Sequence, residues 1–195
     1  MRIVGLTGGI ACGKSLASSY LRSKGIPVID CDEINKKLQL FDPKVQVILK
    51  EKFPLAFDGE KINRKKLAEL VYKSETGLYL INQLMIPFIV KEIQAEIALL
   101  NQLKNKLVFI DAPLLFENGL EAFCDRTVCI YVDEKILKKR FLERPGMSLD
   151  IFEKVISAQM PLDIKKKKAD DIILSDNKED FFKRIDLFLE KTMKN

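Results

Sequence analysis

Histidine and tryptophan are absent from this chain of 195 residues, which also has only nine glycines and seven arginines. Without histidine, the protein cannot build a Ser-His-Asp triad, a histidine metal site or a histidine general base. A proton that is taken up during a reaction at neutral pH must therefore go to a carboxylate, a lysine, a tyrosine or a cysteine. The few arginines leave few candidates for the bidentate binding of phosphate groups.

The four cysteines, Cys12, Cys31, Cys124 and Cys129, form neither a C-x-x-C pair nor the spacing of a zinc site. We expect reduced thiols in a reducing compartment, with Cys12 and Cys31 as small filler side chains rather than redox switches. No apolar run is long enough for a transmembrane helix, and the N-terminus does not resemble a signal peptide. The expected location is cytoplasmic, and the net charge of +5 suits anionic small molecules or nucleic acid as ligands.

Residues 8–15, Gly-Gly-Ile-Ala-Cys-Gly-Lys-Ser, match the phosphate-binding P-loop pattern G-x-x-x-x-G-K-S. An apolar stretch of strand length, 2–7, precedes this loop and a helix-compatible stretch, 15–22, follows it, which is the context that the motif requires. Glycines let successive N–H groups converge on phosphate oxygens at a helix N-terminus. Lys14 is expected to reach the β- and γ-phosphates, and the Ser15 hydroxyl is expected to bind Mg²⁺. The chain is therefore predicted to bind a nucleoside triphosphate.

Short apolar strands alternate with helices, which predicts an α/β fold: the three-layer P-loop NTPase architecture with a five-stranded parallel sheet covered on both faces. The predicted strands are 2–7, 26–29, 107–110, 127–132 and 171–174. The predicted helices are 15–22, 34–40, 43–52, 64–73, 76–103 with an interruption at Pro87, 134–143, 148–158, 161–168 and 178–193.

The chain is predicted to be a single domain with two helical insertions. The stretch between the second and third strands is far longer than a plain crossover needs, so 32–103 is expected to be a helical insert. A second helical stretch, 140–168, is expected to be a lid. The core would then consist of 1–31, 104–139 and 169–195.

Three aspartates follow predicted strands, where ligands bind in parallel α/β sheets. Asp30 and Asp32 could hold Mg²⁺ or accept a proton from an attacking hydroxyl, and equally they could favour the N-terminus of a helix. Asp111 ends the third strand as a Walker-B carboxylate does. Ala112 follows it, where an ATPase would more often have glutamate, and this favours phosphoryl transfer over hydrolysis.

Arg140 and Arg144 share one face of the helix that leads into the predicted lid. An arginine there could close on the phosphates and exclude water, and the alternative is a solvated face that pairs with Glu143 or Asp133. The basic run 165–168 is interpreted as a solvated helix face. The alternative interpretation is that its charge attracts anionic substrates.

Residues 177–180, Asn-Lys-Glu-Asp, match the guanine-reading pattern N-K-x-D of GTPases. A GTPase should also have D-x-x-G after the third strand, and 111–114, Asp-Ala-Pro-Leu, lacks that glycine. So short a pattern also arises easily in a chain rich in lysine, glutamate and aspartate. A GTPase-type switch is therefore the less favoured interpretation.

Four segments together resemble the dephospho-coenzyme A kinase family, and their order and spacing cover nearly the whole chain. They are the opening 3–15, Val28-Ile-Asp-Cys-Asp32, Asp111-Ala-Pro-Leu-Leu-Phe-Glu117, and Ala158-Gln-Met-Pro161 with the lysines and Ala169-Asp170 after it. The chain departs from the family pattern at the acceptor pocket, the lid hinge and the adenine edge. These departures are Ile86, where the family often has histidine, Pro145 after Arg144, and Ser175–Lys178.

The resemblance implies that ATP phosphorylates the ribose 3′-hydroxyl of dephospho-CoA to give CoA and ADP, with Mg²⁺ as cofactor, in coenzyme A biosynthesis. It implies Lys14, Asp32 and Arg140 as catalytic residues, with Asp32 as the base, and Ser15 and Asp111 as Mg²⁺ ligands, directly or through water. The implied ATP-binding residues are Gly8, Gly9, Ala11, Cys12, Gly13, Lys14, Ser15, Leu16 and Asn177. The implied substrate-binding residues are Asp32, Arg64, Pro87, Leu114 and Glu117, with Arg64 as a phosphate partner in the helical insert.

The expected partners are ATP and dephospho-CoA, without nucleic acid or membrane, and the protein is expected to be a monomer or a weak homo-oligomer. The alternative enzyme is another P-loop small-molecule kinase, such as a nucleoside monophosphate kinase.

Overall fold

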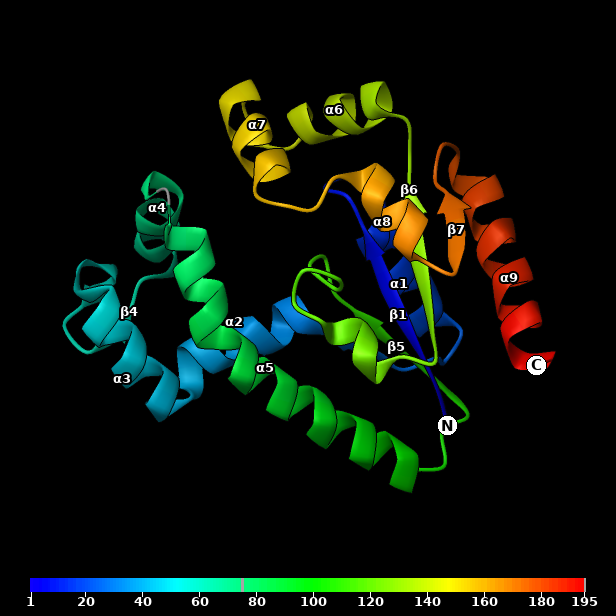
Figure 1. Cartoon of the computed structure of the whole chain (residues 1–195), viewed down its shortest axis with the longest axis horizontal. Helices are drawn as coiled ribbons and strands as arrows, with labels where there is room; N and C mark the ends of the chain where they lie inside the picture. The colour runs from blue at the N-terminus through cyan, green and yellow to red at the C-terminus, as the bar shows by residue number, and fades with distance from the viewer. Residues whose placement is uncertain (75, 195) are drawn as a thin grey trace. The chain divides into compact units, whose positions relative to one another are not determined.

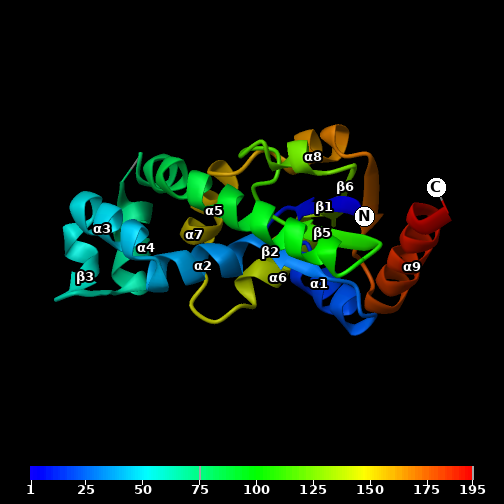
Figure 2. The same ribbon diagram turned by 90° about the horizontal axis from the view of Figure 1, so that it is seen from below.

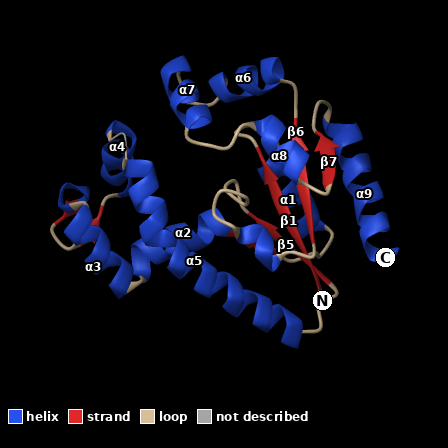
Figure 3. Cartoon of the chain, viewed as in Figure 1, coloured by secondary structure: helices blue, strands red, loops and turns tan. Residues whose placement is uncertain are grey.

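The computed structural model describes residues 1–74 and 76–194 (Figures 1 and 3). The chain folds into two compact units, of which the first comprises residues 1–29 and the chain from Leu99 onward, and the second comprises Asp30–Ala98. Among the described residues, no helix is both long enough and apolar enough to cross a membrane.

The first unit is built on a five-stranded sheet. Its strands are β1 (Arg2–Gly8), β2 (Val28–Asp30), β5 (Leu107–Asp111), β6 (Arg126–Tyr131) and β7 (Asp171–Leu174). They lie in the order β2-β5-β1-β6-β7, and β1 is parallel to β5 and β6, as β6 is to β7. Every residue of β5 is buried, which fits a sheet with helices on both faces. The predicted α/β fold with a five-stranded parallel sheet is confirmed.

Helices cover both faces of this sheet. The two perpendicular views show α1 (Lys14–Ser23) and α9 (Lys178–Lys194) on one face and α8 (Leu162–Lys168) on the other (Figures 1 and 2). The apolar stripe of α9 packs into the core, where Phe181 and Phe188 are buried. This is the packing that the spacing of its aromatic residues predicts.

Two further helices of the first unit are α6 (Glu134–Leu142), of which only the C-terminal end lies in the predicted lid 140–168, and α7 (Leu149–Ser157), which lies wholly within it. They pack on each other through Phe141 and Phe152, which are buried and have ring centroids 5.2 Å apart. Between them Gly146 has φ of 77°, a conformation that glycine adopts without steric cost. A short 3₁₀ helix, η2 (Leu120–Phe123), precedes β6.

The second unit is mostly helical. Its helices are α2 (Cys31–Phe41), α3 (Pro43–Lys52), α4 (Arg64–Lys73) and α5 (Gly77–Gln102), the last of which ends in the first unit. Between α3 and α4 lie the 3₁₀ turn η1 (Pro54–Ala56) and a hairpin of β3 (Phe57–Asp58) and β4 (Lys61–Ile62). The sequence did not predict this hairpin, because strands of two residues carry no readable alternation.

The predicted interruption of a helix at Pro87 is wrong. α5 continues through Pro87 as one helix of 26 residues. Proline removes one N–H donor and usually kinks a helix. Here Met85, Ile89 and Ile93 are buried on either side of it, so packing of both halves stabilises the continuous helix.

Candidate active site

The P-loop connects β1 to α1 and has the backbone geometry of a phosphate-binding loop. Gly13 has φ of 93° and Ala11 has φ of 58°, both in the left-handed region that favours glycine. A side chain at Gly8 would place its Cβ 2.4 Å from the carbonyl oxygen of Ile130. The close approach of β1 and β6 at this point therefore requires a glycine. The first turn of α1 contains no acidic residue, and no side chain of the described residues caps it. The positive end of this helix can therefore receive an anion.

Lys14, the first residue of α1, contacts the carboxylate that ends the neighbouring strand. Its Nζ lies 2.5 Å from Oδ1 of Asp111, and the Ser18 hydroxyl donates to Oδ2 at 2.5 Å. The pair is nearly buried, with 13% of the Lys14 side chain and 3% of the Asp111 side chain exposed. Sheet register brings Asp111 to this point, because it pairs with Leu6 of β1 just before the loop. Two predicted site residues from distant parts of the sequence are thus brought together.

Ser18 is a site residue that sequence reasoning missed. It lies one helical turn after Lys14, so both side chains lie on the same face of α1. The spacing of four residues between Lys14 and Ser18 is the feature of the sequence that could have indicated Ser18. Ser15 and Leu16, which the sequence analysis did predict to bind ATP, are exposed in the first turn of α1.

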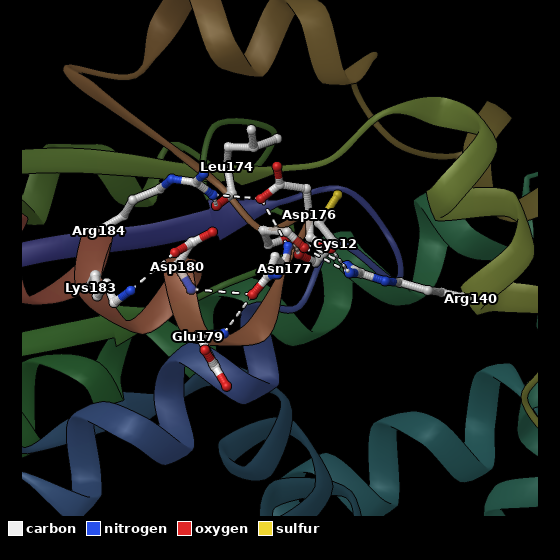
Figure 4. A network of polar contacts seen from close by, with 10 residues as sticks. Cys12, Arg140, Leu174, Asp176, Asn177, Glu179, Asp180, Lys183 and Arg184 are labelled. Atoms are coloured by element: carbon white, nitrogen blue, oxygen red, sulfur yellow. Dashed lines mark hydrogen bonds and ion pairs between the residues drawn. The ribbon is translucent and has the colours of Figure 1, made fainter.

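Arg140 at the end of α6 binds the turn between β7 and α9 (Figure 4). Its guanidinium donates to the carbonyl oxygens of Ser175 at 2.7 Å and of Asp176 at 3.2 Å, and more weakly to the Ser175 hydroxyl at 3.4 Å. The Ser175 hydroxyl in turn donates to the carbonyl oxygen of Cys12 in the P-loop. Arg140 is half-buried in these contacts, whereas Arg144 is exposed. The two arginines therefore differ, since Arg140 is linked to the P-loop through Ser175 and Arg144 lies exposed.

The turn that follows β7 is held by its own side chains (Figure 4). Arg184 donates to the carbonyl oxygen of Leu174 at 2.8 Å and to the Asp176 carboxylate at 2.6 Å, and this bond lowers the pKa of Asp176. The Asn177 side chain accepts from the N–H groups of Glu179 at 2.9 Å and Asp180 at 3.4 Å. Asn177 thus caps α9, so the N-K-x-D match has a structural explanation.

The lysine run on α8 is solvated only in part, which corrects the expectation of a solvated helix face. Lys165 is buried and Lys166 is half-buried, whereas Lys167 and Lys168 are exposed. Lys165 is fully buried and lies 2.9 Å from Glu117. Lys166 lies over the ring of Tyr131, 4.6 Å from its centroid. Lys168 lies over the ring of Phe116 at 5.2 Å. The periodicity of a seven-residue helix with four consecutive lysines could not reveal which of them faces the sheet.

The segment after Asp111 carries two residues that were predicted to bind substrate, Leu114 and Glu117. Leu114 is half-buried, and the Glu117 carboxylate accepts from the backbone N–H of Met160 at 2.8 Å. The segment therefore lies beside the chain that leaves the lid.

Burial makes the thiols of the first unit poor nucleophiles. It raises the pKa of Cys12, although N–H groups of Gly9 and Val132 and the charges of Arg140 and Lys165 partly offset it. It raises the pKa of Cys124 and Cys129 to about 12. Cys12 contributes its carbonyl to the site, and its side chain fills the space beside Gly9, as expected.

The remaining predicted site residues belong to the second unit. Asp30 accepts from the N–H groups of Asp32 and Glu33, both at 3.0 Å, so it caps α2, and Asp32 lies exposed in the first turn of that helix. Arg64 opens α4 and donates to Gln39 at 3.1 Å. Pro87 is exposed on α5. For Asp30 and Asp32 the sequence left two functions open, which were chemistry at the site and stabilisation of a helix N-terminus. Asp30 has the second of these functions.

Comparison with known proteins decides the family. The model of the dephospho-CoA kinase family matches residues 2–180. The chain belongs to the dephospho-CoA kinase family. The dephospho-CoA kinase of Fusobacterium nucleatum is 35% identical over 190 residues, which covers 96% of this chain and 97% of that protein. That of Arabidopsis thaliana is 38% identical over 177 residues, covering 89% of this chain and 75% of that protein.

A solved dephospho-CoA kinase from Campylobacter jejuni has the same fold, with a TM-score of 0.73 and 27% identity over 100% of this chain and 98% of that one. The predictions of a P-loop fold and of an ATP-dependent kinase of the dephospho-CoA kinase family are confirmed. The roles of individual residues stay predictions.

Proposed function

We propose that this protein transfers the γ-phosphoryl group of ATP to the ribose 3′-hydroxyl of dephospho-CoA. The observation that carries the proposal is the P-loop in front of the uncapped first turn of α1, with Lys14 and Asp111 2.5 Å apart beside it, in a chain of this family. Such a helix N-terminus with an adjacent lysine favours a triphosphate.

The triphosphate would be held by the backbone N–H groups of residues 8–15, with Cys12 and Gly13 contributing main chain rather than side chain. Lys14 would bind the β- and γ-phosphates. Because Asp111 already binds its ammonium, phosphate oxygens would compete with that carboxylate for the same cation. Nearby, Leu16 and Asn177 remain candidates for contact with the nucleotide.

The donor groups at this point also fit Mg²⁺. This ion is commonly held by one or two carboxylates together with waters and substrate phosphates, so it does not need a cage of protein ligands. Within the described residues no group of three or more acidic, cysteine or histidine side chains forms such a cage. The exposed Ser15 hydroxyl and the Asp111 carboxylate would hold the ion, directly or through water. Bound Mg²⁺ would neutralise charge on the β- and γ-phosphates.

Two charged residues would act on the reacting groups. Asp32 would accept the proton of the ribose hydroxyl, since an exposed carboxylate in the first helical turn can reach a substrate and histidine is absent. Arg140 would leave the Ser175 and Asp176 carbonyls to bind the transferring phosphoryl group. Arg64, Pro87, Leu114 and Glu117 would bind the acceptor.

The test is an ADP-release assay with Mg²⁺-ATP in which dephospho-CoA is compared with AMP, CMP and shikimate as acceptors. We expect turnover with dephospho-CoA and a phosphorus NMR signal of a 3′-phosphate in the product. A clear preference for AMP or CMP would instead identify a nucleoside monophosphate kinase. Light scattering tests the expected monomer or weak homo-oligomer, and the cytoplasmic location stays a prediction.

A further inference from the structure

One lysine of the run on α8 is entirely buried. Lys165 exposes 0% of its side chain, although lysine is almost never fully buried unless its charge is paired. Its Nζ donates to the carbonyl oxygen of Pro113 at 2.5 Å and lies 2.9 Å from Oε1 of Glu117. Because a buried ammonium is costly, these two oxygens are what keep Lys165 in place.

The Pro113 carbonyl is shared between two elements of the core. It accepts from Lys165 and also from the hydroxyl of Thr7 near the end of β1, at 3.3 Å. Pro113 is only two residues beyond Asp111, and the intervening Ala112 donates its N–H to the carbonyl of Leu6 at 3.0 Å. The chain is therefore anchored at two successive residues where the turn after Asp111 begins.

The Glu117 carboxylate links the same lysine to the chain leaving the lid. Its Oε1 faces Lys165 and accepts from the Met160 N–H at 2.8 Å. Its Oε2 is buried without a hydrogen-bond partner in residues 1–74 and 76–194, so Lys165 supplies the charge that compensates this carboxylate. At the start of α8, Leu162 lies 3.6 Å from the position that a Cβ on Gly9 would occupy. The exit from the lid thus contacts both the P-loop and the segment after Asp111.

We propose that Lys165 is a positioning residue for phosphoryl transfer. The ammonium does not contact substrate. It acts through the Pro113 carbonyl and the Glu117 carboxylate, which it holds so that the segment 112–117 and the lid exit keep a fixed position beside β1. The inference rests on the proposed function, in which Asp111 and Glu117 serve Mg²⁺ and the acceptor. Phosphoryl transfer depends on positioning, so a small displacement of these groups lowers the rate.

The experiment compares Lys165→Met with Lys167→Met in the full chain. Both variants lose one positive charge from the same helix, but Lys167 is exposed. At a temperature at which circular dichroism shows both to be folded, we expect kcat of Lys165→Met to fall about 10–100-fold with KM for ATP nearly unchanged. Lys167→Met should keep kcat and the melting temperature. A folded Lys165→Met variant with wild-type kcat would overturn the proposal. The ion pair of Lys165 and Glu117 would then serve stability alone.

Lys165→Met leaves the Glu117 charge unpaired, so a neutral pair is needed as a second test. Glu117→Gln/Lys165→Met removes both charges and should melt at a higher temperature than Lys165→Met. Its reference is Glu117→Gln, in which Lys165 still binds Pro113. We expect kcat of the double variant to stay about tenfold or more below that reference, because the Pro113 carbonyl has lost the ammonium and keeps the longer bond from Thr7. Equal kcat in the two would overturn the proposal.

Failure of the proposed function is visible separately, since it appears in the wild-type protein as an absence of turnover with dephospho-CoA. Hydrogen exchange of residues 112–120 does not depend on the acceptor. We expect faster exchange there in Lys165→Met than in Lys167→Met, and equal exchange would contradict the anchoring of this segment by Lys165.

Discussion

Lys14 and Asp111, 97 positions apart in the sequence, lie with Nζ and Oδ1 2.5 Å apart. This ion pair joins the start of α1 to the end of β5 and puts a cation and a carboxylate at one point beside the P-loop. Substitution of each partner therefore removes a different part of the proposed chemistry, and the two can be tested separately.

Lys14→Ala should abolish turnover and leave the fold intact. The variant loses the cation assigned to the β- and γ-phosphates, while Asp111 keeps its bond from Ser18. The measurement is ADP release together with a thermal melt followed by circular dichroism. Lys24→Ala is the control, because Lys24 pairs with Asp186 at the surface, away from the P-loop. Near wild-type kcat in Lys14→Ala would contradict the P-loop assignment.

Asp111→Asn should raise the Mg²⁺ concentration needed for half-maximal activity and lower kcat. The amide keeps the size of the side chain and can still accept a hydrogen bond from Ser18, but it no longer attracts the ion. Ser18→Ala is the matched control, since it removes only the bond to Oδ2 and should cost about 1 kcal/mol of the free energy of unfolding. If the Mg²⁺ titration is the same in Asp111→Asn as in the wild type, Asp111 does not serve the metal.

Asp32→Asn should lower kcat far more than Asp30→Asn. Loss of a general base typically costs ~10²–10⁴-fold in rate. In Asp30→Asn the new amide oxygen would still accept the N–H groups of Asp32 and Glu33, so α2 keeps its cap. Steady-state kinetics of both variants decides the assignment. A larger loss of kcat in Asp30→Asn would assign the general base to Asp30 instead of Asp32. If kcat falls in neither variant, the rate depends on positioning of the reactants and not on a general base.

Arg140→Lys should lower kcat more than it raises KM for ATP. A guanidinium can bind two phosphoryl oxygens at once and an ammonium cannot, and the contact should strengthen as the transition state forms. Arg144→Lys is the matched control, because Arg144 is exposed. If both variants have near wild-type kcat, the lid must act through another cation.

The thiols of the half-buried Cys124 and the buried Cys129 should resist alkylation in the folded protein. Because burial raises the pKa of Cys124 and Cys129 to about 12, they stay protonated as the pH rises from 8 to 10. The same thiols in the unfolded chain, with a pKa of about 8.5, become thiolates over that range. Mass spectrometry after iodoacetamide treatment should therefore show a steep increase in rate with pH only in denaturant. Rapid alkylation of the native protein at pH 8 would contradict the burial of these side chains.

Sequence alone was enough for the features that depend on neighbouring residues. The P-loop, the apolar strands that end at Gly8 and Asp111, and most helix boundaries follow from local patterns, because glycine torsions, apolar runs and caps act over a few positions. Four ordered segments were enough to indicate the family. The sequence also determined that no histidine takes part in the reaction.

Tertiary structure decided which side chains meet. The bonds from Arg140 to Ser175, from Ser18 to Asp111 and from Lys165 to Pro113 join residues 35, 93 and 52 positions apart. No local pattern distinguishes Lys165 from the exposed Lys167, because the register of α8 on the sheet determines which lysine is buried. Continuity of α5 through Pro87 was likewise decided by packing, since contacts on both sides of the proline outweigh the loss of one backbone hydrogen bond.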